Sequence, residues 1–310
     1  MTGTVAAPLR LATFNVLHGR CPSADGPSGA VDLSPLAEAV AVLDADVLAL
    51  QELDRGQERS GGVDQARELA GAAGARHWRY ATAFHARAVP GRSWVRDPAV
   101  RGLRVHGPNG GGSGGGPAHG GASGGSPSHG GASGGSPSHG VALYSRLPVL
   151  GWQARRFGEP PLTVPLPAAG GPGGPGLRVV RDHPRVALAA VLRGPGGPFT
   201  AVAVHLSFVP GWNVRQLLSL RRWLAGLPGP HLLLGDFNLP GAVPVSVLRS
   251  AAPHDGWRAL LRARTFPAHR PRAQLDHLLA AGLGPHTAVP VGLPRFAVSD
   301  HRPLAVDLEF

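Results

Sequence analysis

One short apolar run that ends in polar residues constrains the fold of this chain more than any other feature. Leu232, Leu233 and Leu234 are followed directly by residues 235–238, which read Gly-Asp-Phe-Asn. The run predicts a buried strand, and the residues after it place a carboxylate and a carboxamide at one point of a sheet edge. Such a point is suited to hold water together with a metal ion or a phosphate.

The same pattern recurs along the chain. In each case a short apolar strand adjoins polar side chains of the types that take part in catalysis. The segments are Phe14 and Asn15, Gln51 and Glu52, residues 205–207, residues 235–238, Asp276 and His277, and residues 299–301. Because strand ends at one rim of a sheet converge, we expect the carboxylates of Glu52, Asp236, Asp276 and Asp300 to share a pocket.

Such a pocket is electrostatically unstable on its own. Two carboxylates 4 Å apart repel by about 4 kcal/mol at an effective dielectric constant of 20, and the chain has no lysine to balance them. A divalent cation or protonation must relieve this repulsion. A set of oxygen ligands with asparagine and without cysteine suits Mg²⁺ or Mn²⁺ better than Zn²⁺.

Each of these residues also has a structural interpretation when it is taken alone. Asn15 can end a strand, Glu52 can be a surface carboxylate, and Asp236 can form an Asx turn with Asn238. Other structural interpretations are core histidines at His205 and His277, a packing role for Trp212 and an ion pair at Arg185. The joint occurrence of the segments favours a functional site.

Apolar runs and helical periodicity predict the remaining elements. Helices are expected from Ser34 to about Leu43, from Asp64 to Ala73, and from near Asn213, where Gln216 completes a capping box. Strands are expected at residues 9–15, 47–50, 141–144, 186–192, 200–206, 231–234, 275–280 and 303–308. A proline-rich loop is expected at residues 160–175. Strands this apolar and helices this few predict sheet packed on sheet with helices outside, in one domain spanning residues 1–310.

A tandem repeat interrupts this domain. Residues 119–128 and 129–138 are identical, and residues 109–118 look like a degenerate first copy. Sequence made of Gly, Ser and Pro has no apolar surface to bury, so we predict a disordered insertion at residues 107–140. The histidines at positions 119, 129 and 139 could form a metal-binding array, but expansion of the repeat explains their spacing more simply.

The order of the motifs resembles the endonuclease/exonuclease/phosphatase superfamily. This superfamily includes apurinic endonucleases, pancreatic-type deoxyribonucleases, sphingomyelinases and inositol polyphosphate phosphatases. The matching segments are residues 13–15, 50–52, 142–146, 204–207, 235–238, 275–277 and 299–301. The resemblance spans residues 9 to 308 without the repeat. It implies an α+β fold, a four-layer α/β/β/α sandwich of two mixed β-sheets flanked by helices, and Mg²⁺-dependent cleavage of a phosphoester by water.

The resemblance also assigns a metal site and a water site. Glu52 and Asn15 would hold the metal, with Asp300 nearby. Asp236 would orient or deprotonate the attacking water, and Asn238 would position that water or the phosphate. A bound cation that bridges a phosphoryl oxygen offsets the negative charge that grows in the transition state.

The phosphate contacts follow in the same way. His301 would donate to the phosphoryl group or the leaving oxygen, Asp276 would fix its tautomer and ring orientation, and His205 would be a second phosphate-contacting histidine. One departure stands out. Many relatives have Tyr-Gly-Asn where this chain has His139, Gly140 and Val141, which predicts that flexible sequence has replaced a phosphate-contacting loop.

The substrate stays open at this stage. All 30 basic residues are arginine, and they are scattered, so the formal charge of +11 does not by itself indicate nucleic acid. A nucleic acid, a nucleotide or a phospholipid head group would each fit. The alternative to an enzyme is a catalytically weakened phosphate-binding module of the same fold.

The expected location is the cytoplasm. No apolar run approaches the roughly 18 residues of a membrane span, so no transmembrane segment is expected. The first eight residues lack the features of a secretory signal. The single cysteine, Cys21, is typical of a reducing compartment. The sequence leaves the oligomeric state open.

Overall fold

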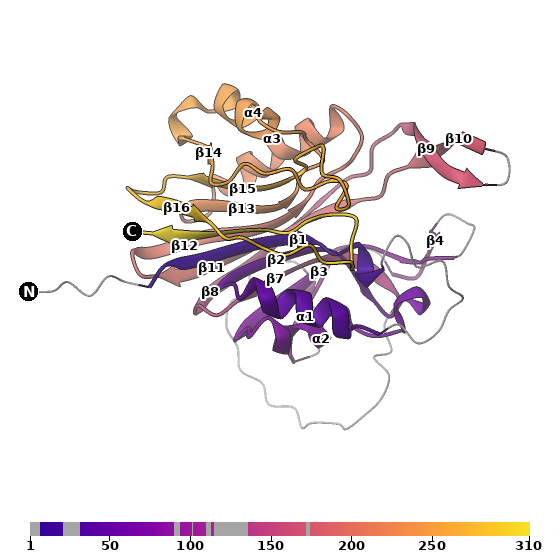
Figure 1. The fold of residues 1–310 in the computed structure, drawn as a ribbon, viewed down its shortest axis with the longest axis horizontal. Helices are drawn as coiled ribbons and strands as arrows, with labels where there is room; N and C mark the ends of the chain where they lie inside the picture. Colours follow the sequence, from indigo (N-terminus) through magenta and orange to yellow (C-terminus); the bar gives the residue numbers. More distant parts are fainter. Residues whose placement is uncertain are drawn as a thin grey trace, which may run out of the picture.

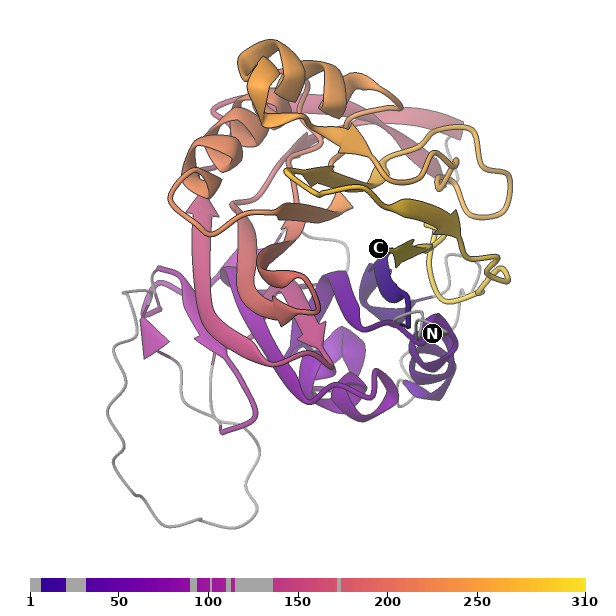
Figure 2. The same ribbon diagram turned by 90° about the vertical axis from the view of Figure 1, so that its left-hand side faces the viewer.

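The computed structural model describes residues 7–20, 32–89, 94–100, 102–109, 113–114, 136–171 and 174–310. Most of the predicted insertion at residues 107–140, with the histidines at positions 119 and 129, lies outside these ranges. The described chain forms four layers, with two β-sheets face to face and helices on both outer sides (Figure 1). Figure 2 shows the indigo and violet helices on one side of the stacked sheets and the orange helices on the other. The predicted α+β sandwich is therefore confirmed.

The first sheet carries the N-terminal half of the site. Its strand order is β16-β17-β1-β2-β7-β3-β5-β6, with β4 paired to β3. Strands β1 and β2 are parallel and the other pairs are antiparallel, so the sheet is mixed. Helices α1 (Ser34–Leu43) and α2 (Gln65–Ala72) pack on its outer face. The strands are β1 (Leu9–Asn15), β2 (Val47–Arg55), β3 (His77–Arg87), β4 (Val95–Arg96), β5 (Arg104–His106), β6 (Ser113–Gly114), β7 (Ser138–Ser145), β16 (Thr287–Pro290) and β17 (Leu304–Glu309).

The second sheet contains the strands that carry Arg185, His205, Asp236 and Asp276. Its strand order is β14-β15-β13-β12-β11-β8, and only β12 and β13 are parallel. Helices α3 (Trp212–Leu224) and α4 (Val243–Ala251) pack on its outer face. The strands are β8 (Val149–Phe157), β11 (Arg185–Gly194), β12 (Gly197–His205), β13 (His231–Asp236), β14 (Arg258–Ala259) and β15 (Asp276–Ala281). A separate hairpin joins β9 (Thr163–Gly171) to β10 (Gly174–Arg181). Short 3₁₀ helices occupy Leu17–Gly19, Glu58–Ser60 and Pro253–Asp255.

Burial on both faces explains the continuous apolar strands. In β13, Leu232 and Leu234 pack into the core between the sheets, whereas Leu233 packs under the outer helices. Successive side chains point to opposite faces of a strand, so a strand covered on both sides needs apolar residues at every position. No helix among the described residues has the length and apolar character needed to cross a membrane.

Several elements are absent from the sequence prediction, among them strands β3 and β8 and helix α4. Strand β3 has no clear periodicity because polar Thr82 and His85 are buried among its apolar residues. Residues 160–175, predicted as a loop, lie largely in the β9–β10 hairpin. A two-stranded hairpin leaves one edge of each strand unpaired, so prolines such as Pro165 cost it no ladder hydrogen bond when their nitrogen faces outward.

We expect Gly235→Ala to destabilise the protein. A Cβ atom at Gly235 would overlap Val204 O of the neighbouring strand β12. Overpacking of this kind typically costs about 1–3 kcal/mol, because a packed neighbour must move. Urea unfolding measures the loss. Gly151→Ala in β8 is the matched control, since a Cβ there meets nothing within 4 Å. Equal stabilities of the two variants would contradict the close approach.

Candidate active site

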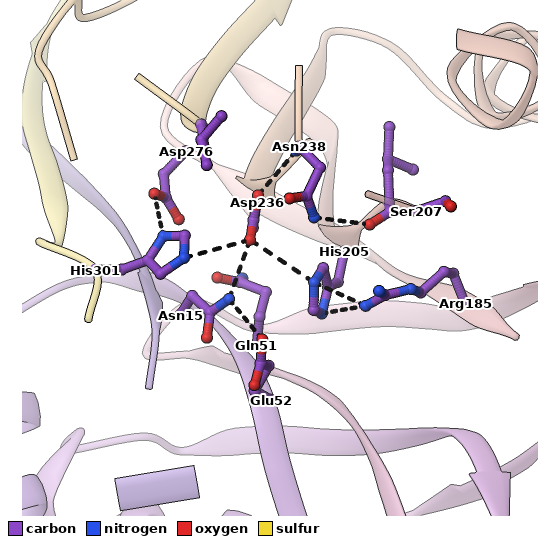
Figure 3. A network of polar contacts seen from close by, with 12 residues as sticks. Asn15, Gln51, Glu52, Arg185, His205, Ser207, Asp236, Asn238, Asp276 and His301 are labelled. Atoms are coloured by element: carbon purple, nitrogen blue, oxygen red, sulfur yellow. Dashed lines mark hydrogen bonds and ion pairs between the residues drawn. The ribbon is translucent and has the colours of Figure 1, made fainter. Parts of the chain in front are cut away.

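Asp236 lies at the centre of the site. It is the last residue of β13 and its side chain is 2% exposed. Its Oδ1 accepts a hydrogen bond of 2.8 Å from the backbone N–H of Asn238, which is an Asx turn, and its Oδ2 accepts one of 3.0 Å from Asn15 Nδ2. The Oδ2 atom also lies 3.7 Å from His205 Nε2 and 3.8 Å from His301 Nε2 (Figure 3). The Asx turn of the structural interpretation is therefore present, and the same carboxylate also faces both histidines.

Asn15 connects the two sheets. It ends β1 of the first sheet, and its Nδ2 donates both to Asp236 and to Glu52 Oε1, 3.1 Å away. Glu52 lies at a bulge in β2, with φ of +61°, opposite the break in register with β7. A left-handed backbone at a non-glycine residue is unusual, and bulges of this kind re-aim a side chain. The bulge thus turns the Glu52 carboxylate toward Asn15.

The loop before β17 brings a histidine and a carboxylate to the same place. Ser299 Oγ donates to the backbone oxygen of Asn15 over 2.6 Å and accepts from the N–H of His301. His301 Nδ1 lies 2.8 Å from Asp276 Oδ2, at the start of β15. The fully buried Asp276 therefore fixes the ring and leaves Nε2 facing Asp236.

Arg185 is the functional candidate that the sequence interpretation missed. It starts β11, and its Nη1 lies 2.8 Å from Nε2 and 3.1 Å from Nδ1 of His205. The predicted ion pair also exists, because Nη2 donates to Asp182 Oδ1 over 2.6 Å. Asp182 is fully buried. The segment Asp-His-Pro-Arg directly before an apolar strand is the sequence signal that could have placed Arg185 at the rim of the site.

Asn238 is held by the loops around it. Its Nδ2 donates to Leu206 O over 3.1 Å, and its own backbone oxygen accepts from Asn213 Nδ2. The capping box predicted at Asn213 and Gln216 is wrong, because no side chain caps α3. Gln216 Oε1 instead accepts from the N–H of Ser207. Both side chains thus satisfy polar groups of the site loops, and Asn213 Oδ1 also accepts from the N–H of Val214 in the first turn of α3.

The surroundings of the two histidines shift their pKa values in opposite directions. Burial is the largest effect on the pKa of His301 and lowers it, but the surrounding carboxylates and the hydrogen bond to Asp276 raise it overall. Burial and the charge of Arg185 lower the pKa of His205 well below its usual value. Burial, reinforced by the charge of Asp276, raises the pKa of Asp236. These shifts favour the charged form of His301 and the neutral form of His205.

A model of the Endonuclease/Exonuclease/phosphatase family matches residues 12–301. The chain belongs to this family. The structure of an endonuclease/exonuclease/phosphatase from Beutenbergia cavernae is similar at 22% identity and a TM-score of 0.59, covering 98% of this chain and 72% of that one. One from Bacteroides vulgatus has 14% identity, a TM-score of 0.58 and coverage of 98% and 99%. The human Nocturnin catalytic domain with bound sulfate has 15% identity, a TM-score of 0.51 and coverage of 99% and 96%. No curated protein matches the chain.

The site fits a divalent metal ion by two observations. Asp236, Asp276 and His301 form a buried group whose ligand atoms lie within 4.8 Å of one another. In addition, Asp276 Oδ1 and Asp300 Oδ1 are buried and lack a hydrogen-bond partner. Buried carboxylate oxygens without partners are costly, and a cation satisfies them. The Asp276–His301 hydrogen bond uses Asp276 Oδ2 and His301 Nδ1, which leaves Asp276 Oδ1 and His301 Nε2 for a ligand.

Two further histidines have different surroundings. His277 Nε2 lies 2.8 Å from Leu239 O in the interior, as expected of a core histidine. His139 lies in β7, and its Nδ1 is 2.8 Å from Asp54 Oδ1. The prediction that flexible sequence replaces this part of the family pattern is therefore wrong for His139, Gly140 and Val141, which form an ordered strand.

We expect Arg185→Ala to destabilise the protein by about 3–5 kcal/mol, because it leaves the buried carboxylate of Asp182 without its charged partner and with only the hydrogen bond from the N–H of His183. Urea unfolding measures the free energy. The double variant Asp182→Ala/Arg185→Ala should lose less than the sum of the single losses. Arg221→Ala is the matched control, since its partner Asp255 is one-third exposed and such pairs contribute about 1 kcal/mol or less. Similar losses in the two arginine variants would contradict the buried pair.

Proposed function

We propose that the protein is a metal-dependent hydrolase that cleaves a phosphoester by attack of water. Membership of the family supports the reaction class. The observation that carries the proposal is the position of Asp236, which two donors hold in place while its Oδ2 faces both histidines. A carboxylate fixed in this way can orient a water molecule toward a phosphorus atom between the histidines.

The two histidines act on the phosphoryl group in different ways. Cationic His301, oriented by Asp276, donates from Nε2 to a phosphoryl or leaving oxygen. Neutral His205 and the guanidinium of Arg185 contact a second phosphoryl oxygen from the opposite side. Negative charge grows on these oxygens in the transition state, and donors fixed in advance stabilise it without reorganisation.

Glu52 and Asn15 would hold Mg²⁺ or Mn²⁺, with Asp300 as a further ligand. Hard oxygen donors suit these ions, and the Asp300 oxygen without a partner adds to this set. When bound, the ion would act as a Lewis acid on a phosphoryl oxygen. Burial, reinforced by the charge of Glu52, raises the pKa of Asp300. The charge of a bound ion would relieve this repulsion between Glu52 and Asp300.

The neighbours keep the substrate class wide. A protein of similar fold from Bacteroides thetaiotaomicron is a mannosyl-6-phosphatase, with 12% identity and a TM-score of 0.50. Another is a humanized zebrafish TDP2, with 13% identity and a TM-score of 0.52. Binding of a phosphate ligand without turnover is the alternative to catalysis. Because His139 is ordered and hydrogen-bonded, its departure from the family pattern does not by itself favour that alternative.

We expect Asp236→Asn and His301→Ala each to lower turnover by about 10² to 10⁴-fold while the fold stays intact. The assay offers plasmid DNA, an abasic duplex, sphingomyelin, inositol phosphates and an aryl phosphodiester, with Mg²⁺ and with a chelator. His254→Ala is the matched control, since His254 is exposed on a 3₁₀ helix away from the site. Activity that survives the chelator would overturn the metal mechanism. No turnover of any substrate, with retained phosphate binding, would favour the binding module.

A second prediction concerns the metal without any turnover. Mg²⁺ should raise the melting temperature of the protein, because an ion bound only by the folded state stabilises it, by about 2.7 kcal/mol at a hundredfold excess over Kd. Glu52→Gln should abolish this shift, and Glu58→Gln should keep it, because Glu58 is exposed at the start of the 3₁₀ helix Glu58–Ser60. Differential scanning calorimetry at constant ionic strength measures the shift. A shift that persists in Glu52→Gln would remove Glu52 from the ligands.

A further inference from the structure

A cleft of about 450 Å³ lies beside the catalytic centre and takes no part in the chemistry described above. Its walls come from β4 and the residue before it, from the loop between β8 and β9, and from the end of β10 and the segment that leads to β11. The lining residues are Trp94, Arg96, Glu159, Arg181, Asp182 and His183. Arg185 connects the cleft to the centre, because it pairs with Asp182 on one side and contacts His205 on the other (Figure 3).

Aromatic rings form one wall of this cleft. Phe84 packs against Trp94, His139 and His183, with ring centroids 4.9, 5.7 and 4.6 Å away. Phe84 and His139 are buried, whereas Trp94 and His183 are partly exposed. Phe84 and His139 also line a small pocket with Arg185 and His205. The aromatic wall therefore runs without a break from the cleft to the catalytic centre.

The Trp94 ring is held in place before any ligand arrives. The guanidinium of Arg59 lies 4.4 Å from the centre of the ring, within the range of a cation–π interaction. Arg59 is itself fixed by two hydrogen bonds, of 2.8 and 2.9 Å, to the buried carboxylate of Asp54. A platform fixed in this way loses little conformational entropy when it binds a flat ligand.

The charges of the cleft disfavour a cationic ligand. Glu159 pairs with Arg96 at 2.6 Å and lies 3.7 Å from Arg181, and Asp182 is taken by Arg185. Both carboxylates of the cleft thus already have arginine partners. The Arg96 and Arg181 side chains are 52% and 64% exposed at its mouth. An ammonium head group would meet these cations, whereas a flat ring attached to a phosphate would meet an aromatic wall and positive charge.

We propose that this cleft binds the nucleobase of a nucleotide whose phosphate lies at the catalytic centre. The inference rests on the proposed function and narrows its substrate class to nucleotides or nucleic acid. The base stacks on Trp94 with its edge toward His183, whose ring is nearly perpendicular to that of Trp94, and the phosphate reaches Arg185 and His205. Stacking of a base on an aromatic side chain is tolerant of the base and strengthens binding substantially.

The test is a comparison of two ligands that differ only in the base. Isothermal titration calorimetry measures Kd for AMP and for ribose 5-phosphate in the His301→Ala protein, with Mg²⁺ present, so that turnover is suppressed. AMP should bind at least about fivefold more tightly, as expected for one stacked base. Trp94→Ala should remove this preference and leave the Kd of ribose 5-phosphate within about twofold. Trp94→Phe should keep most of it.

Trp152→Ala is the matched control, because Trp152 lies on β8 beside Arg79, away from the lining of the cleft. It should keep the full preference for AMP. Equal affinities for AMP and ribose 5-phosphate, a preference that survives Trp94→Ala, or tightest binding of phosphocholine would each overturn the proposal. Because the calorimetry measures binding without turnover, the nucleobase site and the catalytic mechanism can each fail without the other. A nucleobase preference without hydrolysis of any phosphoester would retain the cleft and refute the catalytic mechanism.

Discussion

The hydrogen bond from Asn15 to Asp236 joins the two sheets at their polar ends, and the geometry of the site depends on it. Each residue is the last of a strand, and each strand is buried on both faces up to that point. The apolar core between the sheets sets their separation. The polar groups at the strand ends must therefore satisfy one another across the gap, because the core offers them neither water nor partners.

Much of the fold follows from this constraint and was predictable from the sequence. Runs such as Leu232 to Leu234 fit strands covered on both faces, and several such runs with few helices favour sheet packed on sheet. Strand β3 and the β9–β10 hairpin were not predictable, because neither has the apolar signal of a buried strand. Their positions are set by pairing with neighbouring strands. The intrinsic β-propensity of a segment does not predict such pairing.

The site shows the same division. The residues at strand ends, such as Asn15, Asp236 and Asp276, were found from the sequence, and the structure brings them together around His301. Arg185 was interpreted only as an ion-pair residue. It does pair with Asp182, but the same guanidinium also contacts His205. The pair with Asp182 is the structural role of Arg185, whereas its contact with His205 is the one that matters for the proposed site. That contact joins two strands in space, and no spacing in the sequence encodes it.

The arginine-only composition has a physical meaning in this setting. Two buried carboxylates, Asp54 and Asp182, each receive two hydrogen bonds from one guanidinium, and each arginine also has a second contact, with Trp94 or with His205. A guanidinium can make two parallel hydrogen bonds while its flat face contacts a ring. A lysine ammonium is a point charge and cannot do both. Arginine at positions 59 and 185 therefore couples the buried carboxylates to Trp94 and His205, whatever the origin of the arginines on the surface.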